Sequence, residues 1–423
     1  MYAPPGIIMK KALILLLLFS ANLHATNGYF SHGIGTKSKG MAGAGVSLGE
    51  DAASGALNPA NLVLVGERLE LGGSLFLPDR GFRANDDATG PVQIAPMTYD
   101  SENSLFLIPQ FAYSRQLDEA NAIGVALVMN GLNTEYDDEV FRYFERPGWE
   151  ATAPTGVDLY QMALHLPYSH RVSDSLALGI APIVALQAFR ANGLNPFGAV
   201  SLYPDELTNN GFDYAHGFGI NLGVNFRPAD GLTLGLSVQS RLRMTEFDDY
   251  RGLFAEQGDF DIPASFQAGA SFRLRDDLEL ALDYQRIYYS NIASVGNPND
   301  IPLMTPILGA DDGIGGGWRD AKVFKAGIRW RYDPQTVLRA GYSHGNQIIP
   351  PNQALLNILA PAVGRDHYSI GLTRQLSKAH EISLSLMYSP REEVKGSNPN
   401  TSGQTGTLYM EQTELEISYA WLF

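Results

Sequence analysis

Residues 218–239 read FGINLGVNFRPADGLTLGLSVQ, two runs of alternating side chains joined by a short turn. In the first run, from Phe218 to Phe226, large apolar side chains alternate with glycine and asparagine. In the second, from Leu232 to Gln239, leucine and valine alternate with smaller or polar residues. A period of two is the mark of β-strands that have two different faces. The stretch therefore predicts a tight hairpin of two strands, each with one apolar face.

The same alternation recurs from about residue 69 to the C-terminus, and no helical stripe of similar length competes with it. It predicts fourteen strands, at 67–78, 104–116, 121–132, 157–172, 174–189, 212–227, 231–246, 261–274, 277–290, 321–332, 335–346, 366–376, 379–391 and 408–423. Six tight turns, such as Asp276-Asp277 and Asp333-Pro334, alternate strictly with seven long connections.

This arrangement of turns decides between two classes of β-protein. A soluble β-sandwich has no reason to keep all its short turns at one end and all its long loops at the other. Outer-membrane barrels have short periplasmic turns, long outer loops and an even number of strands. We therefore predict an all-β fold, a 14-stranded antiparallel transmembrane β-barrel.

The composition excludes several other classes. The longest uninterrupted apolar run is Ala12–Phe19. It is far shorter than the roughly 20 residues of a membrane-spanning helix, so a helical membrane protein is excluded. The net charge of −15 argues against nucleic acid or anionic lipid as a partner. The chain has no cysteine, which excludes disulfides, thiolate metal sites and cysteine nucleophiles.

The last predicted strand indicates how the barrel closes. Its apolar residues alternate with polar or small ones up to the end of the chain; they are Leu415, Ile417, Tyr419, Trp421 and Phe423. An edge strand this apolar would invite aggregation unless barrel closure pairs it. An aromatic-rich last strand with a terminal phenylalanine also resembles the assembly signal of outer-membrane proteins. That resemblance implies the barrel-assembly machinery as a partner.

The first 25 residues have the layout of a secretory signal peptide. Lys10-Lys11 is a basic segment, Ala12–Phe19 an apolar core and Leu23-His24-Ala25 a plausible cleavage site. The alternative is a buried N-terminal helix or an anchor. We assign residues 1–25 to a signal peptide, with the mature chain beginning near Thr26.

Residues 26–68 do not alternate and are rich in glycine and other small residues. Their glycines do not satisfy G-x-G-x-x-G, and Lys37-Ser38 lacks the P-loop frame, so nucleotide binding is a poor interpretation. A barrel of fourteen strands encloses a lumen that side chains alone do not fill. We therefore interpret residues 26–68 as an N-terminal plug, or hatch, inside the lumen of a barrel formed by residues 69–423.

The hatch carries a family resemblance. With Gly40-Met41-Ala42-Gly43, Asp51-Ala52 and Asn58-Pro59-Ala60, it resembles the hatch of the FadL/TodX family of outer-membrane long-chain fatty acid and hydrocarbon transporters. Blocks in the barrel match as well, among them Ile262-Pro263-Ala264-Ser265 and Leu338-Arg339-Ala340-Gly341-Tyr342. The resemblance covers essentially the whole mature chain, and the Asn-Pro-Ala block is its most specific part.

The resemblance implies passive transport of hydrophobic compounds across the Gram-negative outer membrane, amid its lipid and lipopolysaccharide. Outer loops would capture the substrate, and a kink in the third strand would open a hole through which it leaves sideways into the bilayer. That strand is near 121–132, where Gly124 or Gly131 would help to bend it. In the hatch, Asn58 and Pro59 would turn the backbone ahead of Ala60. We predict that disrupting this motif lowers transport more than it lowers the amount of folded barrel.

The family captures ligand on its third and fourth outer loops, here about 190–211 and 247–260. The candidate substrate-binding residues of these loops are Phe197, Leu202, Tyr203, Leu253 and Phe254. Such apolar clusters in external loops exceed what solubility requires. The alternative is that they pack on each other and stiffen the loops. We predict that replacing Phe197, Leu202, Leu253 and Phe254 by serine slows uptake while the barrel still assembles.

An inner site for an ionised substrate needs a cation in the lumen. By the alternation Lys325, Arg329 and Arg339 point inward, and an unpaired arginine can hold a carboxylate bidentately. The alternative is that these cations pair with inward acids such as Glu279, Asp283, Glu414 and Glu416. An alkane or arene would need no such anchor, so the substrate class stays open between fatty acids and hydrocarbons.

Two other functions compete with this interpretation. A general diffusion porin would have no hatch before its first strand, and the glycine-rich 26–68 segment argues against it. An outer-membrane lipase would need an exposed Ser–His pair, which His165, His170 and His344 leave open. The chain has no H-E-x-x-H motif and no tight metal cluster. We therefore predict no catalytic residue, no cofactor and no metal site.

Overall fold

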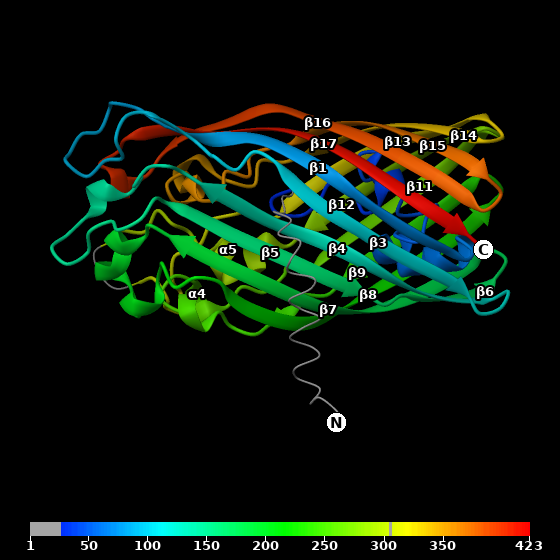
Figure 1. Ribbon diagram of the computed structural model, residues 1–423, viewed down its shortest axis with the longest axis horizontal. Coiled ribbons are helices and arrows are strands. Elements are labelled where there is room, and N and C mark those ends of the chain that lie inside the picture. Colours follow the sequence, from blue (N-terminus) through cyan, green and yellow to red (C-terminus); the bar gives the residue numbers. More distant parts are fainter. Residues whose placement is uncertain (1–26, 304–306) are drawn as a thin grey trace, which may run out of the picture.

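The chain forms a closed barrel with its long loops at one end and its tight turns at the other (Figure 1). The computed structural model describes residues 27–303 and 307–423. The predicted signal peptide, residues 1–25, lies outside this range. Within the described residues, no helix combines the length and the apolar character needed to cross a membrane.

The sheet contains seventeen strand segments. They are β1 (Arg68–Ala84), β2 (Thr98–Asp100), β3 (Phe106–Gln116), β4 (Asn121–Glu135), β5 (Gly156–His165), β6 (Tyr168–Ser173), β7 (Leu176–Asn192), β8 (Asp213–Ala229), β9 (Leu232–Gln239), β10 (Arg243–Met244), β11 (Ser265–Arg275), β12 (Leu278–Ile287), β13 (Ala321–Asp333), β14 (Thr336–Gly345), β15 (Asp366–Ser377), β16 (His380–Ser397) and β17 (Thr405–Leu422).

Three strands of the barrel are each interrupted, which explains why seventeen segments make fourteen strands. β2 and β3 form the second strand, β5 and β6 the fourth, and β9 and β10 the seventh. All neighbours pair antiparallel, and β17 pairs with β1 from Arg68↔Leu422 to Ala84↔Gly406. The 14-stranded antiparallel barrel closed by its last strand is therefore confirmed.

The faces of the strands are the reverse of those of a soluble protein. On β8, Phe218 and Leu222 are 64% and 49% exposed, whereas Asn221 is 2% exposed. Apolar side chains therefore cover the outside of the barrel and polar ones line its lumen, as a wall in contact with lipid requires. The alternation in the sequence follows from this division.

Several strands extend farther outward than the sequence predicted. β1 continues to Ala84, β16 continues to Ser397, and β17 begins at Thr405. β16 and β17 remain paired up to Ser397↔Thr405. Beyond the lipid a strand needs no apolar face, so the period of two fades there while the hydrogen bonding continues.

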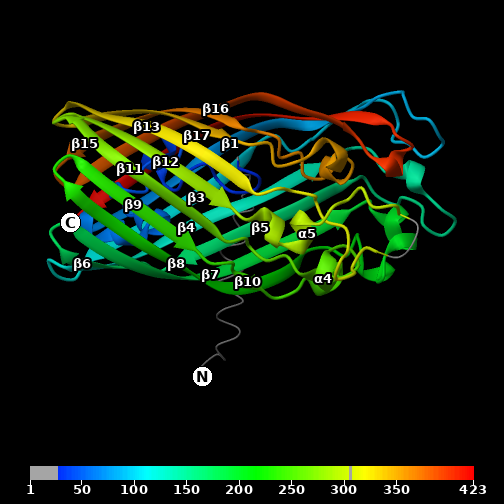
Figure 2. The ribbon, with the colours of Figure 1, turned by 180° about the vertical axis from the view of Figure 1, so that it is seen from behind.

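The segment before β1, called the hatch below, lies in the lumen, in the half of the barrel near the tight turns (dark blue in Figures 1 and 2). It contains α2 (Thr36–Lys39), α3 (Ser54–Leu57) and η1 (Pro59–Leu64). Its residues from Ala52 to Val63 are all buried. These short elements fit a confined space because their side chains are mostly small.

The outer loops carry the remaining helical turns, of which α4 and α5 are labelled in Figure 2. They are η2 (Arg142–Phe144), η3 (Asn195–Val200), η4 (Pro204–Glu206), η5 (Asp248–Tyr250), α4 (Ala255–Gly258), η6 (Tyr289–Asn291), α5 (Ala293–Gly296), η7 (Pro351–Gln353), η8 (Leu356–Ile358) and η9 (Pro399–Thr401). Buried apolar side chains of these loops join one large cluster with the upper lumen.

Candidate functional site

The wall has a gap between β3 and β4. These strands pair only from Gln116↔Ala122 to Phe111↔Leu127. On their other edges, β3 stays paired with β1 as far as Phe106, and β4 stays paired with β5 as far as Glu135. Residues 106–110 of β3 and 128–134 of β4 therefore border a stretch of wall without strand pairing. The resemblance implied a kink in the third strand, near 121–132, and β4 is that strand.

The hatch lies directly at this gap. The Gly131 amide of β4 donates a hydrogen bond to the Tyr29 carbonyl oxygen at 3.2 Å, and the Ser31 amide donates to Asn130 Oδ1 at 3.1 Å. Of the two glycines suggested for a bend, Gly131 lies in the unpaired segment, whereas Gly124 lies in the paired one. Hatch backbone thus takes the place of part of the missing strand partner.

An apolar cavity of about 130 Å³ lies on the outer side of the hatch. It is lined by the loop residues Leu253 and Phe254, by Tyr29 at the tip of the hatch, and by Leu132 in the unpaired part of β4. Phe260 and Trp318 complete much of its aromatic wall. The cavity therefore reaches from the outer loops to the gap in the wall.

A second, polar cavity of about 60 Å³ lies beside the same hatch residues. Val128 and Asn130 of β4 line it, together with His32 and Lys325. Burial lowers the pKa of His32 to about 4, although Glu414 opposes this shift. His32 is therefore neutral at physiological pH, and Lys325 is the cation of this cavity.

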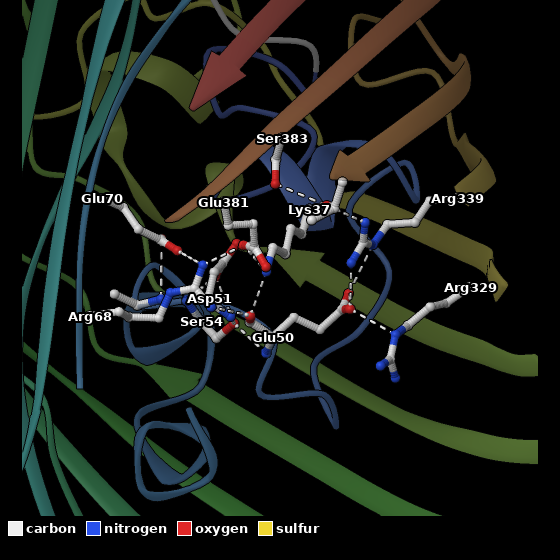
Figure 3. Close-up of polar contacts among 12 residues, drawn as sticks. Lys37, Glu50, Asp51, Ser54, Arg68, Glu70, Arg329, Arg339, Glu381 and Ser383 are labelled. Atoms are coloured by element: carbon white, nitrogen blue, oxygen red, sulfur yellow. Dashed lines mark hydrogen bonds and ion pairs between the residues drawn. The ribbon is translucent and has the colours of Figure 1, made fainter. Parts of the chain in front are cut away.

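Charged groups tie the hatch to the barrel (Figure 3). The Glu50 carboxylate lies 2.7 Å from Arg339 Nη2 and 3.0 Å from Arg329 Nε, and Lys37 Nζ lies 2.7 Å from Glu381 Oε1. Burial alone would raise the pKa of Glu50, but the two guanidinium groups outweigh it and lower the pKa to about 2. Glu50 therefore stays ionised and holds the hatch against β13 and β14.

A second set of contacts fixes other sides of the hatch. Lys39 Nζ lies 2.5 Å from both Glu414 Oε1 and Glu416 Oε2 on β17. On β12, the Asp283 carboxylate accepts hydrogen bonds from the amides of Gly45 and Val46, at 2.7 and 2.9 Å. The hatch is thus bonded to strands around the lumen, and removing one partner of such a buried pair typically costs about 3–5 kcal/mol.

The Asn58-Pro59-Ala60 motif docks the hatch against β7 and β8. The Asn58 side chain accepts from the Ala60 amide at 3.1 Å and donates to the Val46 and Val224 carbonyl oxygens at 2.8 and 3.0 Å. A Cβ added at Gly223 would overlap Asn58 Oδ1. Only glycine leaves room for this contact, so the wall is shaped to receive the motif. Its effect on transport stays a prediction.

The five loop candidates lie in different environments. Leu253 and Phe254 line the apolar cavity. Phe197 is 4% exposed, and its ring lies 4.9 Å from that of Phe141. This contact agrees with the alternative that apolar loop residues pack on each other and stiffen the loops. Leu202 is 46% exposed and lies outside the cavity lining, and the Tyr203 ring lies 5.2 Å from the Arg251 guanidinium.

The three lumen cations differ in their partners. Arg329 pairs with Glu279 at 2.7 Å as well as with Glu50, and Arg339 pairs with Glu50. Lys325 Nζ instead donates to the carbonyl oxygens of His32 and Gly43, at 3.0 and 3.3 Å. Of the three, only Lys325 both lines a cavity and makes its hydrogen bonds to uncharged groups.

Arg80 is a residue of the gap that the sequence analysis missed. It is 3% exposed on β1, and its guanidinium donates to the carbonyl oxygens of Asn103 and Asn133 and lies 5.5 Å from the Phe106 ring centroid. It therefore crosses the lumen side of β3 to reach the unpaired segment of β4. Its inward position was hidden because the predicted first strand ended at residue 78.

Comparison with known proteins places this geometry in a family. Residues 17–421 match the family described as "Outer membrane protein transport protein (OMPP1/FadL/TodX)". The chain belongs to the OMPP1/FadL/TodX family. It is an outer-membrane β-barrel of a transport family, as the resemblance in the hatch implied.

Individual members of the OMPP1/FadL/TodX family are distant in sequence but similar along their whole length. The "Long-chain fatty acid transport protein" of Escherichia coli O6:H1 is 22% identical over 473 residues, covering 100% of this chain and 97% of that protein. The toluene transporter TodX of P. putida superposes with a TM-score of 0.70 at 18% identity, covering 93% of this chain and 99% of TodX. A Pseudomonas aeruginosa FadL homologue gives a TM-score of 0.65 at 16% identity, with coverage of 93% and 99%.

Proposed function

We propose that this OMPP1/FadL/TodX protein transports hydrophobic compounds, long-chain fatty acids or hydrocarbons, passively across the outer membrane. The outer loops capture the compound, and it leaves sideways through the wall between β3 and β4. One observation carries the proposal: the apolar cavity is lined both by Leu253 and Phe254 of an outer loop and by Leu132 of the unpaired segment of β4.

The hatch supports the sideways route. A path along the barrel axis would require breaking its ion pairs with β13, β14, β16 and β17. A path through the gap leaves those pairs intact and requires movement near Tyr29 and Gly131 and of Arg80, which bonds the Asn133 carbonyl oxygen. Each CH₂ group that moves from water into the cavity gains about 0.8 kcal/mol, so no energy source is needed for capture.

The same features favour this function over the two alternatives. A general diffusion porin needs an open aqueous lumen, whereas this lumen holds a buried hatch. A lipase needs an exposed Ser–His pair at the wall. A Ser–His hydrogen bond does exist, between Ser343 Oγ and His367 Nδ1 at 3.2 Å, but both residues are fully buried in the lumen.

The loops provide the first test. We expect the L253S/F254S double variant to lower uptake severalfold, because both side chains line the apolar cavity. The matched control is Leu202→Ser, which removes an exposed loop leucine outside the cavity lining. Uptake of a labelled hydrophobic compound is measured in cells with equal amounts of folded barrel. Equal uptake by L253S/F254S and the unchanged protein would contradict capture at this cavity.

The size of the cavity bears on the substrate. A dry apolar cavity of roughly 150 Å³ binds benzene, so the space of about 130 Å³ here holds a single aromatic ring or a short alkyl segment. A long chain would extend beyond it, past Val128 into the polar cavity, where Lys325 offers a partner for a carboxylate.

A substrate panel distinguishes these cases. If the substrate is a fatty acid, Lys325→Met is expected to lower fatty acid uptake by about tenfold, the effect of losing one charge-assisted hydrogen bond. Uptake of alkanes and arenes by the same variant is expected to stay unchanged. Lys325→Met also removes hydrogen bonds to the His32 and Gly43 carbonyl oxygens of the hatch, so uptake of alkanes and arenes is the internal control for hatch damage. Arg329→Met is no suitable control because it leaves Glu50 and Glu279 without an ion-pair partner; Lys378→Met, in an exposed turn, serves instead. If Lys325→Met takes up fatty acids, like alkanes, as well as the unchanged protein does, a carboxylate anchor at this position is excluded.

A further inference from the structure

Two basic side chains lie next to each other on the outside of the barrel, at the outer ends of β12 and β13. Arg286 and Lys322 are direct register partners. Asp283 and Lys325, three residues away on the same strands, are 5% and 4% exposed and face the lumen. Because side chains alternate along a strand, Arg286 and Lys322 face outward. These ends of β12 and β13 lie beside α5 and the outer loops (Figure 2).

A cavity of about 600 Å³ opens at this position. Three cations line it, Arg286, Arg319 and Lys322, and a single acid, Asp320. The chain as a whole carries a net charge of −15, so an excess of positive charge here runs against the general balance. The cavity therefore has the electrostatic character of an anion site.

One of the cations is held in place by the protein, and two are not. Arg286 Nη2 lies 2.7 Å from Asp320 Oδ2, and its guanidinium lies 4.6 Å from the Tyr288 ring centroid. Asp320 also accepts hydrogen bonds from Ser290. Within residues 27–303 and 307–423, no hydrogen bond or ion pair is formed by Lys322 Nζ or by the Arg319 guanidinium. Both are available to a ligand.

An aromatic pair on the outside of the barrel places the cavity relative to the membrane. The next outward-facing pair toward the membrane is Tyr284 and Phe324, also register partners, whose ring centroids are 4.9 Å apart. Phe324 is 64% exposed. Aromatic girdles of this kind mark the membrane interface of outer-membrane barrels. The cations lie just beyond that girdle, on the side of the long loops.

We propose that this cavity binds a phosphate group of the glycolipid that forms the outer leaflet, lipopolysaccharide. Its phosphorylated sugars sit at the depth of Arg286 and Lys322, directly above the acyl chains that contact Tyr284 and Phe324. Arginine forks and lysine ammonium groups are the side chains that recognise phosphate oxygens. Arg286, oriented by Asp320, and the two unpaired cations together form a cradle for one such group.

The test uses the full-length mature protein in neutral detergent, titrated with the bisphosphorylated lipid A portion of lipopolysaccharide. Native mass spectrometry counts the bound glycolipid. The R319Q/K322Q variant is expected to bind at least about tenfold more weakly, since each basic group near a membrane surface contributes separately. The matched control, R331Q/K378Q, makes the same change of charge at the opposite end of the barrel and is expected to bind as the unchanged protein does. Heat-modified mobility on a gel verifies that each barrel is folded.

Two further arms identify the source of the phosphate. Dephosphorylated lipid A is expected to bind as weakly to the unchanged protein as lipid A binds to R319Q/K322Q. Millimolar inorganic phosphate is expected not to displace bound lipid A. Undiminished binding by R319Q/K322Q, equal binding of the dephosphorylated glycolipid, or displacement by inorganic phosphate would each overturn the proposal. Because none of these readouts involves uptake, the result is independent of the proposed transport function.

Discussion

Replacing Lys39 with methionine is expected to open the barrel to water and ions. Lys39 Nζ lies 2.5 Å from both Glu414 and Glu416, which are buried side by side on β17. Without the ammonium group, two carboxylates face each other in the lumen with their nearest cation gone. Removing one partner of a buried ion pair costs about 3–5 kcal/mol, so the hatch loses much of its hold on this wall. Conductance of single barrels in planar bilayers is expected to rise from near zero to a measurable value.

A rescue variant separates this effect from a general loss of folding. Neutralising both carboxylates in the same protein, as K39M/E414Q/E416Q, removes the uncompensated charge and is expected to return conductance close to that of the unchanged protein. Lys378→Met, in an exposed turn at the periplasmic end, serves as the control and is expected to leave conductance unchanged. A closed barrel in K39M would show that this ion pair does not hold the hatch.

The architecture could be predicted from the sequence because the alternation within each strand indicates which side chains face lipid and which face the lumen. Leu222 beside Asn221 is enough to assign one side to lipid and the other to the lumen, and fourteen repeats of that pattern count the strands. The hatch was predictable for the opposite reason: its small residues carry no alternation. Both signals are local, so they need no knowledge of the tertiary structure.

The partners across the lumen could not be predicted, because they are distant in the sequence. The inward acids Glu414 and Glu416 were candidates to pair with barrel cations, yet they pair with Lys39 of the hatch, more than 370 residues away. Asp283 accepts hydrogen bonds from hatch amides, and of these acids Glu279 alone pairs with a barrel arginine, Arg329. Alternation fixes the face of a residue but not its height or its neighbour across the bore.

Two residues in the sequence mark the gap in the wall. Gly131 was considered as a bend, and it does lie in the unpaired segment of β4. Pro109, in the facing segment of β3, is a second signal, because proline cannot donate to a strand ladder and is confined to edges and irregular positions. The two together, on consecutive strands, would have indicated where the pairing stops.

The central claim is that substrate leaves between β3 and β4, and reversible obstruction of that gap tests it most directly. The chain has no cysteine, so a single engineered cysteine can be labelled uniquely. Met129→Cys places it in the unpaired segment of β4; Ile123→Cys places it at an equivalent outward position in the paired segment of the same strand. A bulky methanethiosulfonate reagent then attaches through a disulfide that reductant removes.

Labelling at position 129 is expected to lower uptake by at least about tenfold, equivalent to roughly 1.4 kcal/mol in the barrier, and reductant is expected to restore it. Labelling at position 123 is expected to leave uptake unchanged. Mass spectrometry of each labelled barrel establishes that both sites react to the same extent. Full uptake by the labelled Met129→Cys protein would contradict sideways release through this gap.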